Sequence, residues 1–94
     1  MLTLDQFEPL LGEQFVLQDH ASGAICAALI EARRLAGPAS GGRLPFALLF
    51  EGPPDPLLAQ CIYRASHPVF EALDLFLVPV GRGRSGMQYE AVFN

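Results

Sequence analysis

The sequence contains no lysine, only two cysteines and no apolar run that approaches the roughly 20 residues needed for a membrane-spanning helix. Its six basic residues, all of them arginines, are outnumbered by ten acidic ones, and the formal net charge is −4. A nucleic-acid binder needs a basic stripe that neutralises phosphates, and a polybasic membrane anchor needs the same charge. We therefore expect no nucleic acid among the partners of this chain and no insertion into a membrane.

The first residues contain no basic segment followed by an apolar core, so the sequence shows no secretory signal. This start predicts a cytoplasmic protein, and incorporation into an extracellular assembly is the alternative. The two cysteines, Cys26 and Cys61, fit no metal or redox spacing. In a reducing compartment each is predicted to be a small buried hydrophobic residue, with a disulfide between them as the alternative. The sequence implies no metal and no cofactor.

At 94 residues the chain is long enough for one domain with one core, which we place at residues 1–94. Hydrophobic residues make up 51% of it and charged residues 17%. A domain of this size buries only roughly 60–65% of the surface that its unfolded chain exposes, so part of the apolar surplus is exposed or meets another subunit. Because exposed apolar patches usually mark interfaces, we predict a protein partner, with a homo-oligomer favoured. The alternative is a monomer whose alanine, glycine and proline content inflates the hydrophobic count.

The C-terminal third of the chain has the pattern of a β-hairpin. Two runs rich in aromatic and branched residues, 73–80 and 87–93, flank the Gly/Arg/Ser stretch 81–86. The second run alternates apolar and polar residues, whereas the first is apolar on both faces and needs cover on each. Pro79 in the first run predicts a bulge or an edge position. The face opposite the leucines is the candidate self-association face, and it consists of Phe76, Val78 and Val80.

Three shorter runs, 15–19, 46–50 and 61–66, also predict strands. The segment from Ala24 to Ala36 is ambiguous, because its apolar residues fit helical spacing as well as strand alternation and alanine favours a helix. A strand followed by a tight turn at His20 needs an antiparallel partner, and on that topological argument we predict a strand here too.

The N-terminal segment predicts a short helix. Thr3 and Gln6 have the spacing of a capping box, and Pro9 is tolerated only in a first turn, so a helix that is partly 3₁₀ is expected to cover one end of the core. Together these elements predict a mainly β fold, a small antiparallel six-stranded barrel or sandwich with one short N-terminal helix. A helical segment from Ala24 to Ala36 would instead make the fold α+β.

Several short motifs, which together span nearly the whole chain, are similar to those of one family of proteins. They lie at residues 2–7, 12–15, 46–53 and 75–81, and the most specific is the C-terminal Tyr-Glu-Ala-Val-Phe-Asn at residues 89–94. Through them the chain resembles a family of small bacterial domains of unknown function. The resemblance implies a companion of phage-tail-collar-like proteins that builds or tethers an extracellular fibre. In that family the segment at 24–34 looks more β-branched, which supports a strand, and the family offers no catalytic residues to carry over.

No catalytic residues are predicted. A Ser-His-Asp set can be assembled on paper from either histidine, but no Gly-x-Ser-x-Gly elbow is present and most chains of this length offer such a set. His67 precedes Pro68 and is expected to be a turn residue that is hydrogen-bonded to the backbone. We therefore predict that the protein is not an enzyme.

The stretch 81–86 is the candidate loop for a ligand or a partner. Its glycines let backbone N–H groups face an anion, and two arginines supply charge. A phosphate site also needs a helix after the loop, whereas a strand follows here, so a mobile hairpin loop is the alternative. The candidate residues are Arg82, Arg84 and Ser85.

The aromatic residues are predicted to form the core, and the alternative is that they line a barrel mouth and hold an apolar molecule. The favoured function is therefore a non-enzymatic β-domain that acts through protein–protein contacts, as an accessory of a phage-tail-like or surface structure. A small-molecule-binding barrel that uses the aromatic cluster or the Arg82/Arg84 loop is the second hypothesis. The aromatic cluster consists of Phe46, Phe50, Phe70, Phe76, Phe93, Tyr63 and Tyr89.

Overall fold

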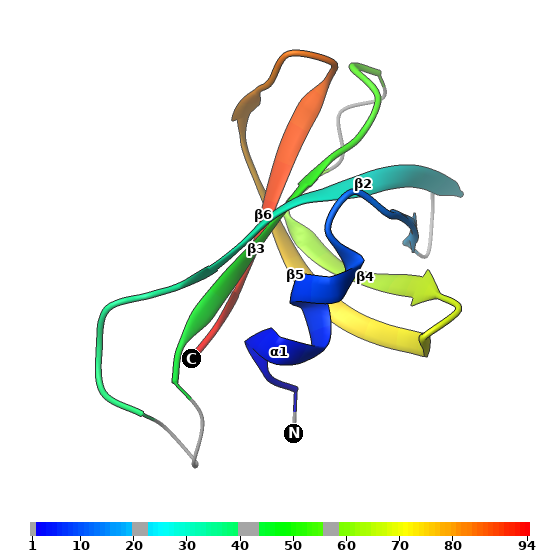
Figure 1. Cartoon of the computed structure of the whole chain (residues 1–94). Coiled ribbons are helices and arrows are strands. Elements are labelled where there is room, and N and C mark those ends of the chain that lie inside the picture. The colour runs from blue at the N-terminus through cyan, green and yellow to red at the C-terminus, as the bar shows by residue number, and fades with distance from the viewer. Residues whose placement is uncertain (1, 20–22, 40–43, 56–58) are drawn as a thin grey trace.

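A computed structural model describes residues 2–19, 23–39, 44–55 and 59–94 of the chain. Within these ranges a short helical segment is followed by six strands (Figure 1). In chain order the elements are α1 (Leu4–Phe7), the 3₁₀ turn η1 (Glu8–Leu10), β1 (Gln14–Gln18), β2 (Ala24–Arg34), β3 (Phe46–Glu51), β4 (Cys61–His67), β5 (Phe70–Arg82) and β6 (Met87–Phe93).

The strands form one antiparallel sheet that closes on itself in the order β1-β2-β3-β6-β5-β4. Strands that follow one another in sequence pair with each other, with the exception of β3 and β4. Instead, β3 pairs with β6 and β4 pairs with β1. The β1–β4 pairing closes the barrel, with Val16 opposite Ser66 and Gln18 opposite Arg64. Closure gives every strand two neighbours, although residues 70–77 of β5 pair with β4 only and residues 29–34 of β2 pair with β3 only. The predicted fold class is confirmed, and the closure makes the fold a barrel and not a sandwich.

β2 is a strand from Ala24 to Arg34, so the helical alternative for this segment is wrong. It pairs with β1 on one side and with β3 on the other. Ala27 and Leu29 face the interior and are fully buried. The helix preference of alanine over other residues is well under about 1 kcal/mol per residue, and the burial and hydrogen bonds gained between two neighbouring strands outweigh it.

The barrel interior is filled with large side chains, so most of the aromatic cluster is core, as predicted. Phe15 meets Phe50 edge-on, with their ring centroids 5.3 Å apart. Ring surfaces that pack against one another in this way are not available to bind a ligand. The largest fully buried side chains are Tyr63, Tyr89, Phe7, Phe15, Phe46, Phe50, Leu17, Leu29, Leu48, Leu75 and Leu77.

The N-terminal segment closes one end of this core. The predicted capping box is present, and in it the backbone N–H of Thr3 donates to Oε1 of Gln6 at 2.8 Å. Phe7 is fully buried, and its ring centroid lies 6.0 Å from that of Phe46 and 5.9 Å from that of Phe93. The helix, partly 3₁₀ as expected, therefore inserts an aromatic ring among the rings of β3 and β6.

Two predictions about individual side chains are wrong. Phe76 is not part of the aromatic core but lies on the outer face of β5, because strand alternation with its two buried leucine neighbours turns it outward. Cys26 is exposed, since it lies opposite the outward-facing Val16, and Cys61 is half-buried. Both cysteines are free thiols.

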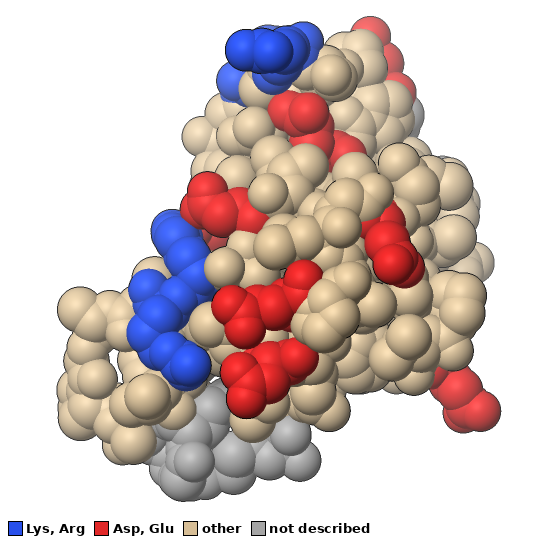
Figure 2. All heavy atoms as spheres, viewed as in Figure 1, with Lys and Arg blue, Asp and Glu red and all other residues tan. Residues whose placement is uncertain are grey.

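Charged side chains are unevenly distributed over the surface. On the face drawn in Figure 2, basic atoms gather at the tip of the β5–β6 hairpin and beside β2, and acidic atoms lie between and around them. Beside β2 the two signs compensate, because Arg33 contacts both Glu31 and Glu90. Within the described residues, no helix has the length and apolar character needed to cross a bilayer.

Candidate functional site on the outer face of β4 and β5

The candidate self-association face lies on the outside of the barrel. Phe76 is 51% exposed and Val80 is 50% exposed, while Val78 between them is half-buried. Phe76 is opposite Ile62 of β4, which is 59% exposed, so these two side chains form a cross-strand pair. A single exposed apolar residue is ordinary, but neighbouring ones make a patch. We call the set of Ile62, Phe76, Val78 and Val80 the apolar face.

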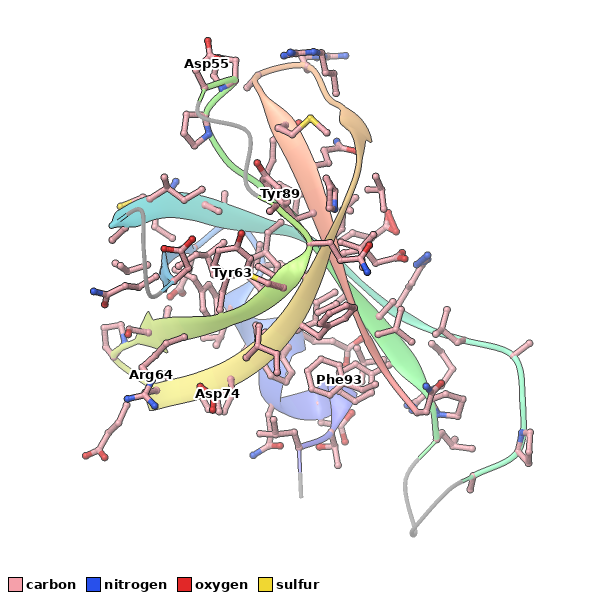
Figure 3. The ribbon with its side chains drawn as sticks, turned by 180° about the vertical axis from the view of Figure 1, so that it is seen from behind. Asp55, Tyr63, Arg64, Asp74, Tyr89 and Phe93 are labelled. Carbon is pink, nitrogen blue, oxygen red and sulfur yellow. The ribbon has the colours of Figure 1, made fainter. Side chains whose placement is uncertain are left out.

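One ion pair follows the Ile62–Phe76 pair along the same two strands. Arg64 of β4 is opposite Asp74 of β5, and the distance from Nε to Oδ1 is 3.6 Å. Both side chains are 65% exposed. Figure 3 shows them on the outside of β4 and β5, whereas Tyr63 lies toward the middle of the barrel. The apolar face therefore ends in one positive and one negative charge.

A groove of about 380 Å³ adjoins this ion pair. It opens on the outer surface where β1 ends beside β4, and Ile62 of the apolar face belongs to its lining. The other four described lining residues are all polar or charged, so the groove is mainly polar, with Ile62 as its apolar residue. Among the described residues, its lining comprises Gln18, Asp19, Ile62, Arg64 and Asp74.

The sequence predicted the β5 part of this site but missed Ile62, Arg64 and Asp74. These residues become neighbours only through the register between β4 and β5, which the sequence does not reveal. The available signal was alternation. Because Tyr63 is a large aromatic residue that belongs in the core, its neighbours on β4 had to face outward.

The hairpin tip, residues 81–86, packs against the end of β3. The N–H of Gly83 donates to the carbonyl oxygen of Gly86 at 2.7 Å, and the N–H of Gly52 donates to Met87 at 2.9 Å. A Cβ atom on Gly86 would overlap the backbone carbonyl group of Gly52, so only glycine allows the tip to approach the end of β3 this closely. The tip is thus held by backbone contacts, and the carboxylate of Glu51, which accepts a hydrogen bond from the side chain of Gln88 at 3.1 Å, lies beside Gly83. At its end Arg82, Arg84 and Ser85 are exposed, and neither arginine has an ion pair with a described residue.

A β-bulge separates the hairpin tip from the apolar face. The register between β5 and β6 shifts between Pro79 and Gly81, as the proline predicted. Beyond the shift Arg82 is opposite Met87, which packs against the core. Simple alternation from Val80 would have placed Arg82 on the outer face instead. The structure therefore does not join the two sets of predicted site residues into one site.

His67 has a structural role and is not available as a base. It is 8% exposed, and its Nδ1 accepts a hydrogen bond from the N–H of Val69 at 3.0 Å, as predicted for a turn residue. Its Nε2 therefore carries the proton of the neutral ring and donates to Oε1 of Glu13 at 2.6 Å. Both ring nitrogens are engaged, so the hypothetical catalytic set has no free histidine here. His20 lies outside the described residues.

Tyr63 is the one described group whose acidity is clearly changed. Burial raises the pKa of its phenol well above the ordinary value, and a hydrogen bond with Cys61 adds to the effect. The hydroxyl donates to the carbonyl oxygen of Ala59 at 2.5 Å, which ties the segment before β4 to the wall. A phenol with a raised pKa stays protonated and acts as a donor, so this contact is structural.

These observations define the class of the protein as a small closed antiparallel β-barrel with a filled interior and an apolar outer face. Within the described residues, no three His, Cys, Asp or Glu side chains come together as a metal ion would require. The chain belongs to the DUF6916 family, a domain of unknown function whose match covers residues 2–93. No curated protein and no solved structure matches the chain. The family has no function attached to it, so the function must be inferred from the geometry.

Proposed function

We propose that this domain is a non-enzymatic β-barrel that acts through protein–protein contacts made by the apolar face. The observation that carries the proposal is the Ile62–Phe76 pair, two large apolar side chains that lie side by side and are each more than half exposed. Full burial of one such side chain is worth roughly 1.5–3 kcal/mol. A partner that covers the pair therefore gains binding free energy. A further copy of this chain is the favoured partner, in line with the apolar surplus of the sequence.

A small-molecule-binding barrel is the second candidate. The exposed Arg82 and Arg84 favour it, because neither has an ion pair with a described residue. Two observations weigh against it. The carboxylate of Glu51 lies against the Gly83 backbone and would repel an anion at the tip, and the aromatic rings of the interior contact one another. The apolar face is therefore the better-supported site.

The substitution Phe76→Ser tests the proposal, and Val69→Ser is the matched control. Val69 is 64% exposed but lies in the turn between β4 and β5, away from the apolar face. We expect the wild type and the control to associate in light scattering at micromolar concentration, or to retain a partner when used as baits. Phe76→Ser should lose that association. A wild-type chain that is strictly monomeric and retains no partner would contradict the proposal.

We further propose that the contact serves a phage-tail-like or surface assembly. The support for this part is the family resemblance of the motifs at residues 46–53, 75–81 and 89–94, not the geometry of the barrel. Affinity capture with wild-type bait, followed by mass spectrometry, should recover structural proteins of such an assembly in the chain's own host. Recovery of the same proteins by Phe76→Ser bait, or of none by the wild type, would argue against it.

A further inference from the structure

The first part of β5 is an open strand edge. Residues 70–77 pair with β4, but the pairing of β5 with β6 begins only at Val78, which is opposite Glu90. The same register would carry this pairing on to Phe93, the last residue of β6, yet no such pair is present among the described residues. Figure 3 shows the two strands diverging, with Phe93 between them. We call residues 70–77 the β5 edge.

An aromatic ring lies between the separated strands. Phe7 stacks on Phe70 at the start of β5, with the ring centroids 5.0 Å apart, and its centroid is 5.9 Å from that of Phe93 at the end of β6. Phe7 is fully buried, so closing the two strands onto each other would displace a large apolar side chain from the core. The separation of β5 and β6 is therefore part of the packed fold.

The β5 edge carries backbone groups that no described strand satisfies. In an antiparallel pair, alternate residues direct their N–H and C=O groups away from the partner strand. Along residues 73–77, which pair regularly with β4, these groups point to the side from which β6 has diverged. Such a row is a template for a further strand, and proteins commonly block it with lysine or proline. The β5 edge contains neither.

The other open edge, residues 29–34 of β2, is less available. The N-terminal segment packs against β2 and bonds to the first residue of that edge. The N–H of Gly12 donates to the carbonyl oxygen of Leu29 at 2.7 Å, and the N–H of Leu29 donates to that of Glu13 at 3.0 Å. Within the described residues, no backbone hydrogen bond joins the N-terminal segment to β5. Of the two edges, that of β5 is therefore the more open.

The side chains of the β5 edge favour a basic partner with apolar residues. Its two charged residues, Glu71 and Asp74, are both acidic and both exposed. Glu71 has no ion pair with a described residue, and the pair of Asp74 with Arg64 is long, at 3.6 Å. Between the two carboxylates, Leu73 is half-buried and leaves apolar surface on the inner side of the strand. A strand that alternates apolar and basic side chains matches both features.

We infer that the β5 edge binds an extended basic segment of a partner protein, which joins the barrel as a further strand. Backbone hydrogen bonds supply the affinity, and Glu71 and Asp74 select arginine or lysine over acidic residues. A second copy of β5 would instead bring its own carboxylates against these two. The inference goes beyond the proposed function, because it concerns the backbone edge of β5 and not the side chains of the apolar face.

A basic peptide tests the inference on the full chain. The probe is acetyl-Arg-Val-Leu-Arg-Leu-Val-Arg-amide, whose pattern reads the same in both directions and therefore suits a parallel or an antiparallel strand. Hydrogen exchange of the β5 amides is followed by NMR. In the free chain, alternate amides of residues 73–77 should exchange rapidly, because they point away from β4. With peptide at ten times its Kd, the same amides should exchange about tenfold more slowly. Slow exchange of every amide in the free chain, or no slowing by the peptide, would overturn the inference.

Methylation of the peptide backbone distinguishes strand addition from side-chain binding. N-methyl groups on every second residue block the N–H groups along one side of the peptide and leave its side chains and charge in place. One of the two alternating sets should weaken binding at least about tenfold, because it removes the hydrogen bonds to β5. Loss with both sets would also support strand addition, with the peptide bonded to β5 and β6 together. Equal binding of methylated and unmethylated peptides would contradict it.

Charge is tested on both partners. The double variant Glu71→Gln, Asp74→Asn should bind the basic peptide about three- to tenfold more weakly at low salt, with a smaller difference at high salt. The same peptide with glutamate in place of arginine should bind the wild type more weakly than the basic one. An acidic peptide that protects the β5 amides equally well would rule out the basic partner.

Phe76→Ser separates this inference from the proposed function. The variant keeps the backbone edge and loses only a cross-strand side-chain contact, so its affinity for the peptide should fall by no more than about fivefold. Abolished peptide binding would mean that the peptide sits on the apolar face, which would overturn the β5 edge and leave the proposed function standing. A chain that binds the peptide, but whose association does not depend on Phe76, would overturn the proposed function alone.

Discussion

Two parts of the barrel wall present very different outer surfaces. Over β3, Ala47 faces away from the interior and yet is only 1% exposed. Its neighbour in register is Arg33 of β2, whose guanidinium crosses to β6 and meets Glu90 at 2.8 Å. Arg33 also reaches Glu31 at 3.4 Å. We call this region the covered side, because long charged side chains lie over a small apolar residue there.

The apolar face over β4 and β5 has no comparable cover from the described residues. Arg64 and Asp74 form an ion pair with each other and leave Ile62 and Phe76 more than half exposed. The chain thus has the means to shield its outer wall and uses them on the covered side. Exposed apolar side chains also occur on β1, β2 and β6, at Val16, Ile30 and Val92. What distinguishes β4 and β5 among the described strands is that two large exposed apolar side chains lie directly opposite each other there, as expected of a contact surface.

The largest effect should come from comparing the two faces of β5 itself. Leu77→Ala removes a fully buried side chain and should destabilise the fold by about 2–5 kcal/mol. Phe76→Ala, one residue earlier, should cost less than about 1 kcal/mol in dilute solution, where association does not contribute. Urea denaturation of both variants measures the difference. A similar loss for both would mean that Phe76 supports the fold and that the apolar face is not open.

A second test adds volume to each side of the wall. Ala47→Leu has to displace the cover over a residue that is 1% exposed, and overpacking of this kind costs about 1–3 kcal/mol. Ala72→Leu is the matched control, because Ala72 is exposed on β5 and should change stability by less than about 0.5 kcal/mol. Equal effects in urea denaturation would remove the distinction between covered and open wall.

The sequence predicted a six-stranded antiparallel barrel or sandwich and an outward-facing apolar face on β5, because strand alternation carries that information. The run at residues 73–80 was apolar on both faces, and a strand in a small barrel can bury only one. For the segment from Ala24 to Ala36, the topological argument predicted a strand and helix propensity favoured a helix, and the strand is correct. Phe76 was assigned to the aromatic core as well as to the outer face, and only the outer position is right.

What the sequence could not supply is register. Ile62 faces Phe76, and Arg64 faces Asp74, through a pairing that one residue of slip would reverse. The bulge after Pro79 was predicted, but its effect on Arg82 was not, since one extra residue moves every later side chain to the other face. The contact of His67 with Glu13 joins residues 54 positions apart and has no local signal.

The pKa of the Tyr63 phenol tests whether the inner side of β4, behind the apolar face, is shielded from solvent. Burial raises the pKa of this phenol above its ordinary value near 10, so above that pH the unfolded chain loses a proton that the folded chain keeps. Its contribution is therefore fully present below about pH 10, and stability should fall by up to about 1.4 kcal/mol per pH unit above it.

Tyr63→Phe removes the titrating group and should flatten this part of the pH profile, measured by urea denaturation from about pH 8 to 11. The variant also loses the hydrogen bond to Ala59, which should lower stability by about 0.5–1.5 kcal/mol at neutral pH. If stability depends on pH in the same way in Tyr63→Phe and in the wild type, the Tyr63 phenol is not shielded by the fold. The inner side of β4 would then be open to solvent, and the contrast between its two faces would disappear.

The smallest effects should come from the two ion pairs that distinguish the sides. Arg33→Ala removes the contact with Glu90 and uncovers Ala47, so it should cost about 0.5–1 kcal/mol at low salt and less at high salt. Arg64→Ala breaks a longer and more exposed pair and should cost close to nothing in the monomer. Double-mutant cycles with Glu90→Ala and Asp74→Ala, run in dilute solution, give the two coupling energies. A stronger coupling for Arg64 with Asp74 would mean that this pair serves the fold, and the contrast between the two sides would disappear.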